Sequence, residues 1–113
     1  LSEIADIPSE QIELLRVAPN WQTRVDAAHT AYRETKAPAT YDFDPARFER
    51  MIVPTLLLSG GESPHWFTEA IEAINDALPD GRVVVLEGQE HVAMNTAPDL
   101  FIDAVLTFIR ELD

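Results

Sequence analysis

The sequence of 113 residues predicts an α/β fold in which two parallel strands alternate with helices. Two short apolar runs, at residues 53–58 and 82–86, are typical of strands that are buried on both faces. A helical pattern follows each run, at residues 64–78 and 98–112, so the order is strand, helix, strand, helix. Because parallel strands need a long crossover connection, this order predicts a right-handed parallel unit.

The N-terminal part of the chain carries helical patterns alone. A helix is predicted over residues 21–36, and Pro38 is expected to end it. Its apolar face consists of Trp21, Val25, Ala28 and Tyr32. We therefore divide the chain into a helical segment, residues 1–43, and an α/β segment, residues 44–113.

The α/β segment needs more sheet than its own two strands provide. Each of its helices has one apolar face, made of Phe67, Ile71, Ile74 and Leu78 in the first and of Phe101, Val105, Phe108 and Leu112 in the second. Two strands do not form a stable parallel sheet by themselves, because their faces and outer edges need cover. The chain also opens at Leu1 within a helical pattern, so we expect that sequence is missing upstream.

The composition restricts the classes of function. A formal net charge of −12 argues against a nucleic-acid partner and against an anionic membrane surface. The chain has no cysteine, which excludes disulfides, thiolate metal sites and cysteine nucleophiles. No apolar run reaches the roughly 20 residues of a membrane helix, and no signal-peptide pattern is present at the start. We therefore expect a soluble, cytoplasmic protein.

The loops that follow the two predicted strands carry the residues best suited to catalysis. The first loop contains Glu62 and the second contains His91. Because adjacent parallel strands lie about 4.8 Å apart, side chains on these loops can meet at one edge of the sheet. A carboxylate that orients an imidazole general base forms two-thirds of a hydrolytic triad. The alternative is that His91 packs on the sheet edge and Glu62 is a solvated loop carboxylate.

The α/β segment resembles the C-terminal part of the α/β-hydrolase family. The resemblance is carried by V-P-T-L-L-L-S-G at 53–60, V-V-V-L-E-G-Q-E-H at 83–91 and P-D-L-F at 98–101. The block E-H-V-A-M-N-T-A-P at 90–98 is similar to the G-x-x-H region of that family. In the family an acid loop follows the seventh strand and a histidine loop follows the eighth. The resemblance implies the C-terminal part of an α/β-hydrolase parallel sheet, preceded by a helical cap segment.

The sequence departs from the family pattern at two places. Many members have G-x-x-D in the acid loop, but counting from Gly60 the aspartate position holds Ser63, one residue after Glu62. Either Glu62 is the triad acid, or the acid comes from another strand end. The nucleophile motif G-x-S-x-G, which follows the fifth strand in the family, is absent, and so is the oxyanion-hole loop.

The resemblance therefore implies an esterase-like hydrolase that is inactive as this chain alone. His91 is its general base, and a serine nucleophile lies in a missing N-terminal half, in the same or a separate chain. No cofactor is implied. No metal site is expected either, because the histidines show no H-x-x-x-H or H-E-x-x-H pairing.

Four apolar residues are candidates for contacts with a small-molecule substrate. Trp66 follows the acid loop and Met94 lies in the histidine loop, where each can equally be a packing residue. Trp21 and Tyr32 form either a substrate roof or the core of the cap itself. If they form a roof, the substrate is a small apolar or aromatic ester-like molecule.

Three other interpretations remain open. An aspartate nucleophile would make the complete protein an epoxide hydrolase or a dehalogenase, and a perhydrolase would use the same histidine. The absence of an aspartate at Ser63 favours a non-catalytic α/β-hydrolase-like binding or interaction protein. The third interpretation is an unrelated parallel α/β domain that binds a small molecule. The absence of a phosphate-binding glycine motif argues against it.

Overall fold

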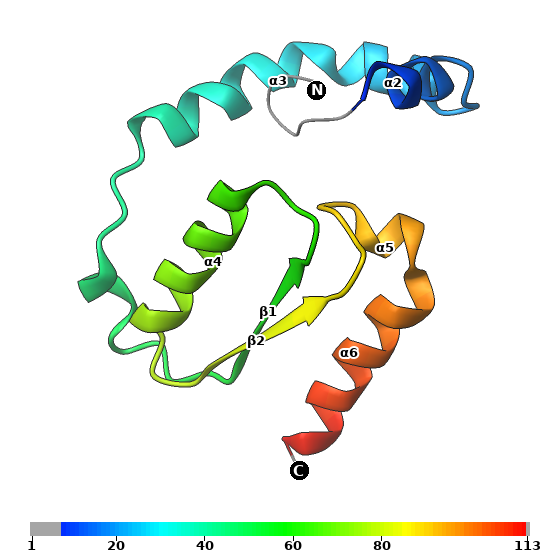
Figure 1. The fold of residues 1–113 in the computed structure, drawn as a ribbon. Coiled ribbons are helices and arrows are strands. Elements are labelled where there is room, and N and C mark those ends of the chain that lie inside the picture. The colour runs from blue at the N-terminus through cyan, green and yellow to red at the C-terminus, as the bar shows by residue number, and fades with distance from the viewer. Residues whose placement is uncertain (1–7, 113) are drawn as a thin grey trace. The chain divides into compact units, whose positions relative to one another are not determined.

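The computed structural model describes residues 8–112, which fall into two compact units (Figure 1). The first unit ends at Phe43 and the second begins at Asp44. The interpretation of the first unit as a cap stays a prediction.

The described residues of the first unit, 8–43, contain two helices, α2 (Ser9–Arg16) and α3 (Trp21–Thr40). The prediction that Pro38 ends the second helix is wrong, because α3 continues to Thr40. A proline in the last turn removes only one backbone hydrogen bond. The turn is held by the Thr40 hydroxyl, which donates to the carbonyl of Ala37 at 3.2 Å. The Tyr41 N–H, which donates to the carbonyl of Pro38 at 3.2 Å, closes it.

The second unit is built on a parallel pair of strands, β1 (Thr55–Gly60) and β2 (Gly81–Leu86). Their register places Thr55 opposite Gly81 and Gly60 opposite Leu86, so the two strands end side by side. The predicted order of strand, helix, strand and helix is confirmed.

Helices lie on both sides of these strands. Helix α4 (His65–Ala77) lies on one side and α6 (Pro98–Glu111) on the other (Figure 1). A 3-10 turn, η1 (Pro45–Phe48), precedes β1, and the Asp44 carboxylate caps it. A short helix, α5 (Ala93–Thr96), lies within the segment that was expected to be a loop.

The core of the second unit is small. Among residues 8–112, the apolar residues that are buried are Leu78, Leu86 and Ala93. The three valines of β2 have side chains that are 36% to 49% exposed. The expectation of a strand buried on both faces is therefore wrong for β2 within this chain, because β1 is its one strand neighbour in the described residues.

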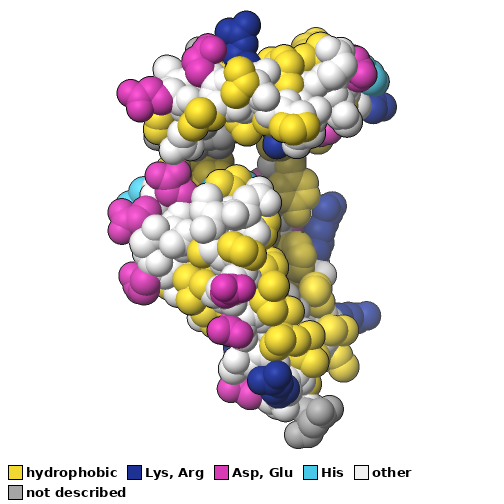
Figure 2. Space-filling model, turned by 90° about the vertical axis from the view of Figure 1, so that its right-hand side faces the viewer, with side chains coloured by type: hydrophobic (Ala, Val, Ile, Leu, Met, Phe, Trp, Pro, Cys, Tyr) yellow, Lys and Arg dark blue, Asp and Glu magenta, His cyan; other side chains and the backbone are white. Residues whose placement is uncertain are grey.

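Helix α6 also presents apolar side chains to water. Its exposed residues include Ile102, Leu106 and Ile109, which recur at helical spacing. Figure 2 shows hydrophobic side chains gathered along this side of the second unit. The helix therefore has a second apolar face beside the one that was predicted to pack on the sheet.

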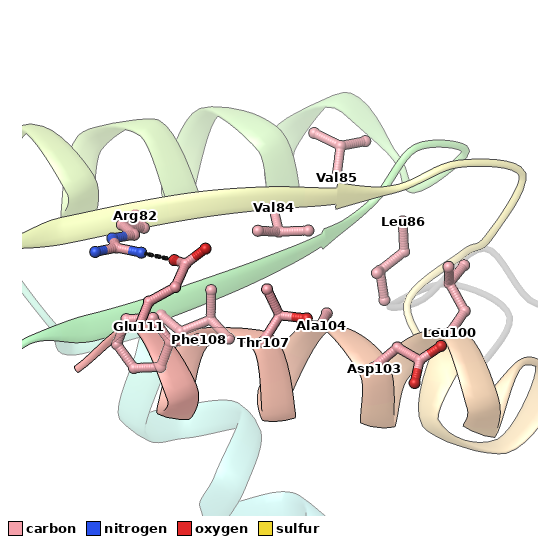
Figure 3. Close-up of a pocket in the computed structure, with 11 residues that line it drawn as sticks. Arg82, Val84, Val85, Leu86, Leu100, Asp103, Ala104, Thr107, Phe108 and Glu111 are labelled. Carbon is pink, nitrogen blue, oxygen red and sulfur yellow. Dashed lines mark hydrogen bonds and ion pairs between the residues drawn. The ribbon is translucent and has the colours of Figure 1, made fainter. Parts of the chain in front are cut away.

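A groove of about 340 Å³ separates β2 from α6 (Figure 3). At one end of it the Arg82 guanidinium donates to the Glu111 carboxylate. The same guanidinium lies 5.5 Å from the ring centroid of Phe108. These contacts attach the last turn of α6 to the start of β2.

Candidate catalytic site

The loops after β1 and β2 are joined by backbone hydrogen bonds. The N–H of Gly61 donates to the carbonyl of Leu86 at 3.0 Å. The N–H of Glu62 donates to the carbonyl of Gln89 at 2.8 Å. The acid loop and the histidine loop therefore lie against each other, as the parallel pairing of the strands requires.

Gly60 allows this close approach. A Cβ atom at this position would lie 2.5 Å from the carbonyl oxygen of Glu90 and 2.6 Å from that of Gln89. Both atoms belong to the backbone, so they have little freedom to move away. The glycine is therefore required by the closeness of the histidine loop, whereas Gly88 takes a positive φ of 68° in the turn after β2.

The ring of His91 is exposed and stacks on Phe67. The two ring centroids are 4.4 Å apart and the ring planes differ by 18°. Trp66 also stacks with Phe67, at a centroid distance of 3.7 Å and an angle of 24°. Because both aromatic residues lie in the first turn of α4, this helix start supplies the surface on which the imidazole rests.

The histidine loop is also closed by a side-chain hydrogen bond. The Thr96 hydroxyl donates to the side-chain oxygen of Gln89 at 2.8 Å. Gln89 therefore makes two contacts: its side chain closes the segment 89–96, which carries His91, and its backbone carbonyl accepts the bond from Glu62 in the acid loop.

Glu62 comes near the histidine loop through its backbone alone. Its side chain is exposed, and within residues 8–112 no hydrogen bond joins its carboxylate to the ring of His91. The role of Glu62 as the triad acid stays a prediction.

A cavity of about 190 Å³ lies beside His91. Met94 and Ser63 line it together with His91, whereas Glu62 and Trp66 do not. Most of its other lining residues are apolar and come from both strands and from α4, α5 and α6, among them Leu58, Phe67, Ile71 and Phe101. An apolar lining with a few polar groups is the composition of small-molecule sites, whose volumes are usually about 300–1,000 Å³, so this cavity is small for one.

The two substrate candidates in the first unit lie on α3. Trp21 is half-buried at its start. Tyr32 is exposed, and the ammonium group of Lys36 lies 4.3 Å from its ring centroid. Their role as a substrate roof stays a prediction.

Sequence reasoning missed Phe67 and Thr96 as parts of the site. Phe67 was identified as one residue of an apolar helix face, which predicts packing but not a particular neighbour. Thr96 carries no signal in the sequence, because its bond to Gln89 depends on the path of the loop.

Within residues 8–112, no cluster of three or more histidine, aspartate or glutamate side chains could hold a metal ion. In the same residues no helix is long and apolar enough to cross a membrane.

The chain shares its fold with part of a protein of known structure. No family model matches the sequence, and no curated protein matches it. A crystal structure described as an alpha/beta hydrolase from Sphaerobacter thermophilus DSM 20745 does match, with a TM-score of 0.74 and 29% sequence identity. The chain has the fold of part of an α/β hydrolase. The alignment covers 96% of this chain and 41% of the Sphaerobacter chain.

The predicted fold class is thereby confirmed. The two parallel strands and their helices match one part of an α/β hydrolase, and the chain spans less than half the length of the Sphaerobacter chain. Activity and substrate are properties of the whole protein.

Proposed function

We propose that this chain is the C-terminal part of an α/β hydrolase and supplies its catalytic histidine, His91. The observation that carries the proposal is the position of this residue. Its exposed ring follows β2, at the carboxyl end of a parallel strand pair that matches an α/β hydrolase, and it borders an apolar cavity. Catalytic groups of open α/β sheets gather at this end of the strands.

The proposed reaction is hydrolysis of a small ester-like or apolar substrate. A nucleophile outside this chain, a serine by preference, attacks the acyl carbon while His91 takes the proton from its hydroxyl group. His91 then gives the proton to the leaving group, and a water molecule releases the acyl group in the second half of the reaction. The cavity beside His91 suits an apolar portion of the substrate.

Glu62 is the candidate in this chain for the carboxylate that orients His91. The bond from its N–H to Gln89 brings its backbone to the histidine loop, which supports the assignment. Its exposed carboxylate keeps open the alternative of an acid from another strand end.

We also propose that the N-terminal half of the hydrolase domain covers this chain, as part of the same or a separate polypeptide. The exposed valines of β2 and the apolar side chains of α6 support such a partner. A strand pair with open edges supports it further, because parallel sheets are normally covered on both faces.

The experiment that tests the catalytic role is the substitution His91→Ala in the complete protein, assayed with a series of small esters. We expect kcat/KM to fall by about 10² to 10⁴-fold, which is the usual contribution of a general base. The matched control is His65→Ala on α4, an exposed histidine that pairs with Glu69 at 3.2 Å. An unchanged rate in His91→Ala would refute the proposal.

A second candidate function is binding without catalysis. It is favoured by Ser63 at the aspartate position and by the lack of a hydrogen bond from Glu62 to His91 in the described residues. In that case a serine-reactive phosphonate would not label the complete protein, although a small apolar ligand would still bind saturably.

A further inference from the structure

We propose that Phe67 is a positioning residue for His91, which holds the imidazole ring in place and stabilises its protonated form. The inference rests on the proposed catalytic role of His91. The near-parallel stack, with centroids 4.4 Å apart, is the contact that carries it.

The stack restrains the side chain of His91, which forms no hydrogen bond within the described residues. The ring of His91 is exposed, and no side chain within residues 8–112 forms a hydrogen bond with it. A stacked aromatic neighbour removes one side of the space into which the imidazole could rotate. Orientation of a catalytic group is worth a large factor in rate, because a displacement of about 1 Å can cost about a hundredfold.

Phe67 is itself held in place. It is half-buried at the start of α4, and Trp66 stacks with it at 3.7 Å. Its ring also lines the cavity beside His91. The three rings therefore form one aromatic cluster, made of Trp66, Phe67 and His91, in which Phe67 is the middle ring and stacks with both of the others.

The aromatic face also acts on charge. When His91 accepts a proton from the nucleophile it becomes a cation, and a cation over an aromatic face is stabilised by the quadrupole of the ring. Glu90 is the other titratable residue that lines the cavity, and Glu62 lies in the adjoining loop. The titratable residues of α4 are His65, Glu69, Glu72 and Asp76. A substitution at Phe67 leaves all of these titratable residues unchanged.

The test compares Phe67→Leu with Phe67→Tyr in the complete protein, with esters as substrates. Leucine fills similar space without an aromatic face, whereas tyrosine keeps the face. We expect Phe67→Leu to lower kcat by between about fivefold and about a hundredfold. Because Phe67 also lines the cavity beside His91, KM reports separately on any loss of substrate contact. Phe67→Tyr should keep most of the wild-type kcat. The matched control is Phe108→Leu, a half-buried phenylalanine on α6 in the other groove, which should leave kcat unchanged.

A second readout does not depend on activity. The ring protons of His91 lie over the face of Phe67, so their NMR signals should be displaced upfield in the wild type and in Phe67→Tyr. They should return toward ordinary values in Phe67→Leu. If Phe67→Leu fails to fold by circular dichroism, Phe67→Met takes its place, because methionine also lacks the ring and adapts its shape more easily.

The outcomes separate the two proposals. Equal kcat in wild type and Phe67→Leu, together with a large loss in His91→Ala, overturns the positioning role and leaves the catalytic role standing. An equal loss in Phe67→Leu and Phe67→Tyr also overturns it, since shape rather than the aromatic face would then matter. Unchanged activity in His91→Ala overturns both, whatever the NMR signals show.

Discussion

His91 meets an aromatic ring on its exposed loop, while the nearest candidate carboxylate reaches that loop through its backbone. Phe67 stacks on the imidazole, and the N–H of Glu62 binds the carbonyl of Gln89. The two contacts have different physical origins: one restrains the ring and the other restrains the loop. Substitutions can therefore separate the orientation of the side chain from the position of the backbone.

At this scale the first prediction concerns Glu62→Gln. If Glu62 orients His91, loss of its charge should lower kcat of the complete protein by at least about tenfold, because a general base works only in the correct tautomer. Esterase kinetics at neutral pH provide the measurement. Glu87→Gln is the matched control, since Glu87 is another exposed carboxylate in the same pair of loops. Equal rates for wild type and Glu62→Gln would assign the acid to another strand end.

The second prediction concerns Gly60→Ala. The added Cβ would meet two backbone oxygens at 2.5 and 2.6 Å, so the histidine loop must move. We expect a loss of about 1–3 kcal/mol in the free energy of unfolding, as for other overpacked sites. Urea denaturation measures it. Gly61→Ala is the control, because its Cβ would lie no closer than 3.4 Å to Leu86 and its neighbours. Equal stability of the two variants would contradict the close approach at Gly60.

Helix α6 contacts the start of β2 through side chains at its C-terminal end. Arg82 at the start of β2 contacts both Glu111 and Phe108, across a groove that separates the rest of the two elements (Figure 3). The ion pair is half exposed on both sides, at 45% and 53%, so water screens much of its attraction.

The third prediction is that Glu111→Gln costs little. We expect the free energy of unfolding to fall by less than about 1 kcal/mol, which is typical of an exposed pair. The effect should diminish further in high salt. Thermal unfolding at low and high ionic strength measures both effects. Glu13→Gln, which removes the exposed pair with Arg16 in α2, provides a comparison on a single helix. A loss of several kcal/mol would mean that the pair is buried in the complete protein.

At the scale of the whole molecule, the second unit exposes apolar side chains that no other described element covers. The second unit buries few apolar side chains among its described residues, and it exposes the valines of β2 and one face of α6 (Figure 2). A hydrophobic face this open is expected where another part of a protein packs against it. The match to 41% of the Sphaerobacter hydrolase agrees with that expectation.

The fourth prediction concerns Ile109→Ala in a longer protein that includes the proposed N-terminal half. Ile109 is 52% exposed in the structure of this chain, so without further cover the substitution should cost no more than about 1 kcal/mol of unfolding free energy. If the N-terminal half covers α6, burial should raise the cost to about 2–5 kcal/mol. Denaturant unfolding measures the cost, and the control is Leu78→Ala, which is already buried at 9% exposure. A cost of about 1 kcal/mol or less for Ile109→Ala would contradict the proposed cover.

The sequence by itself determined the order of the elements and the two loops that carry Glu62 and His91, whereas the first strand lies two residues later, at Thr55–Gly60, than the predicted 53–58. These features follow from local patterns of apolar residues, prolines and glycines, which act on the neighbouring chain. The extension of α3 beyond Pro38 shows the limit of such rules, because hydrogen bonds in one final turn compensate for the proline.

Only the tertiary structure decided which groups meet. The stack of Phe67 on His91, the closeness of Gly60 to the histidine loop and the exposure of the β2 valines all depend on how distant segments dock. An apolar strand looks the same in the sequence whether or not other strands cover it. Burial and stacking are properties of the space between elements, and local patterns along the chain do not specify that space.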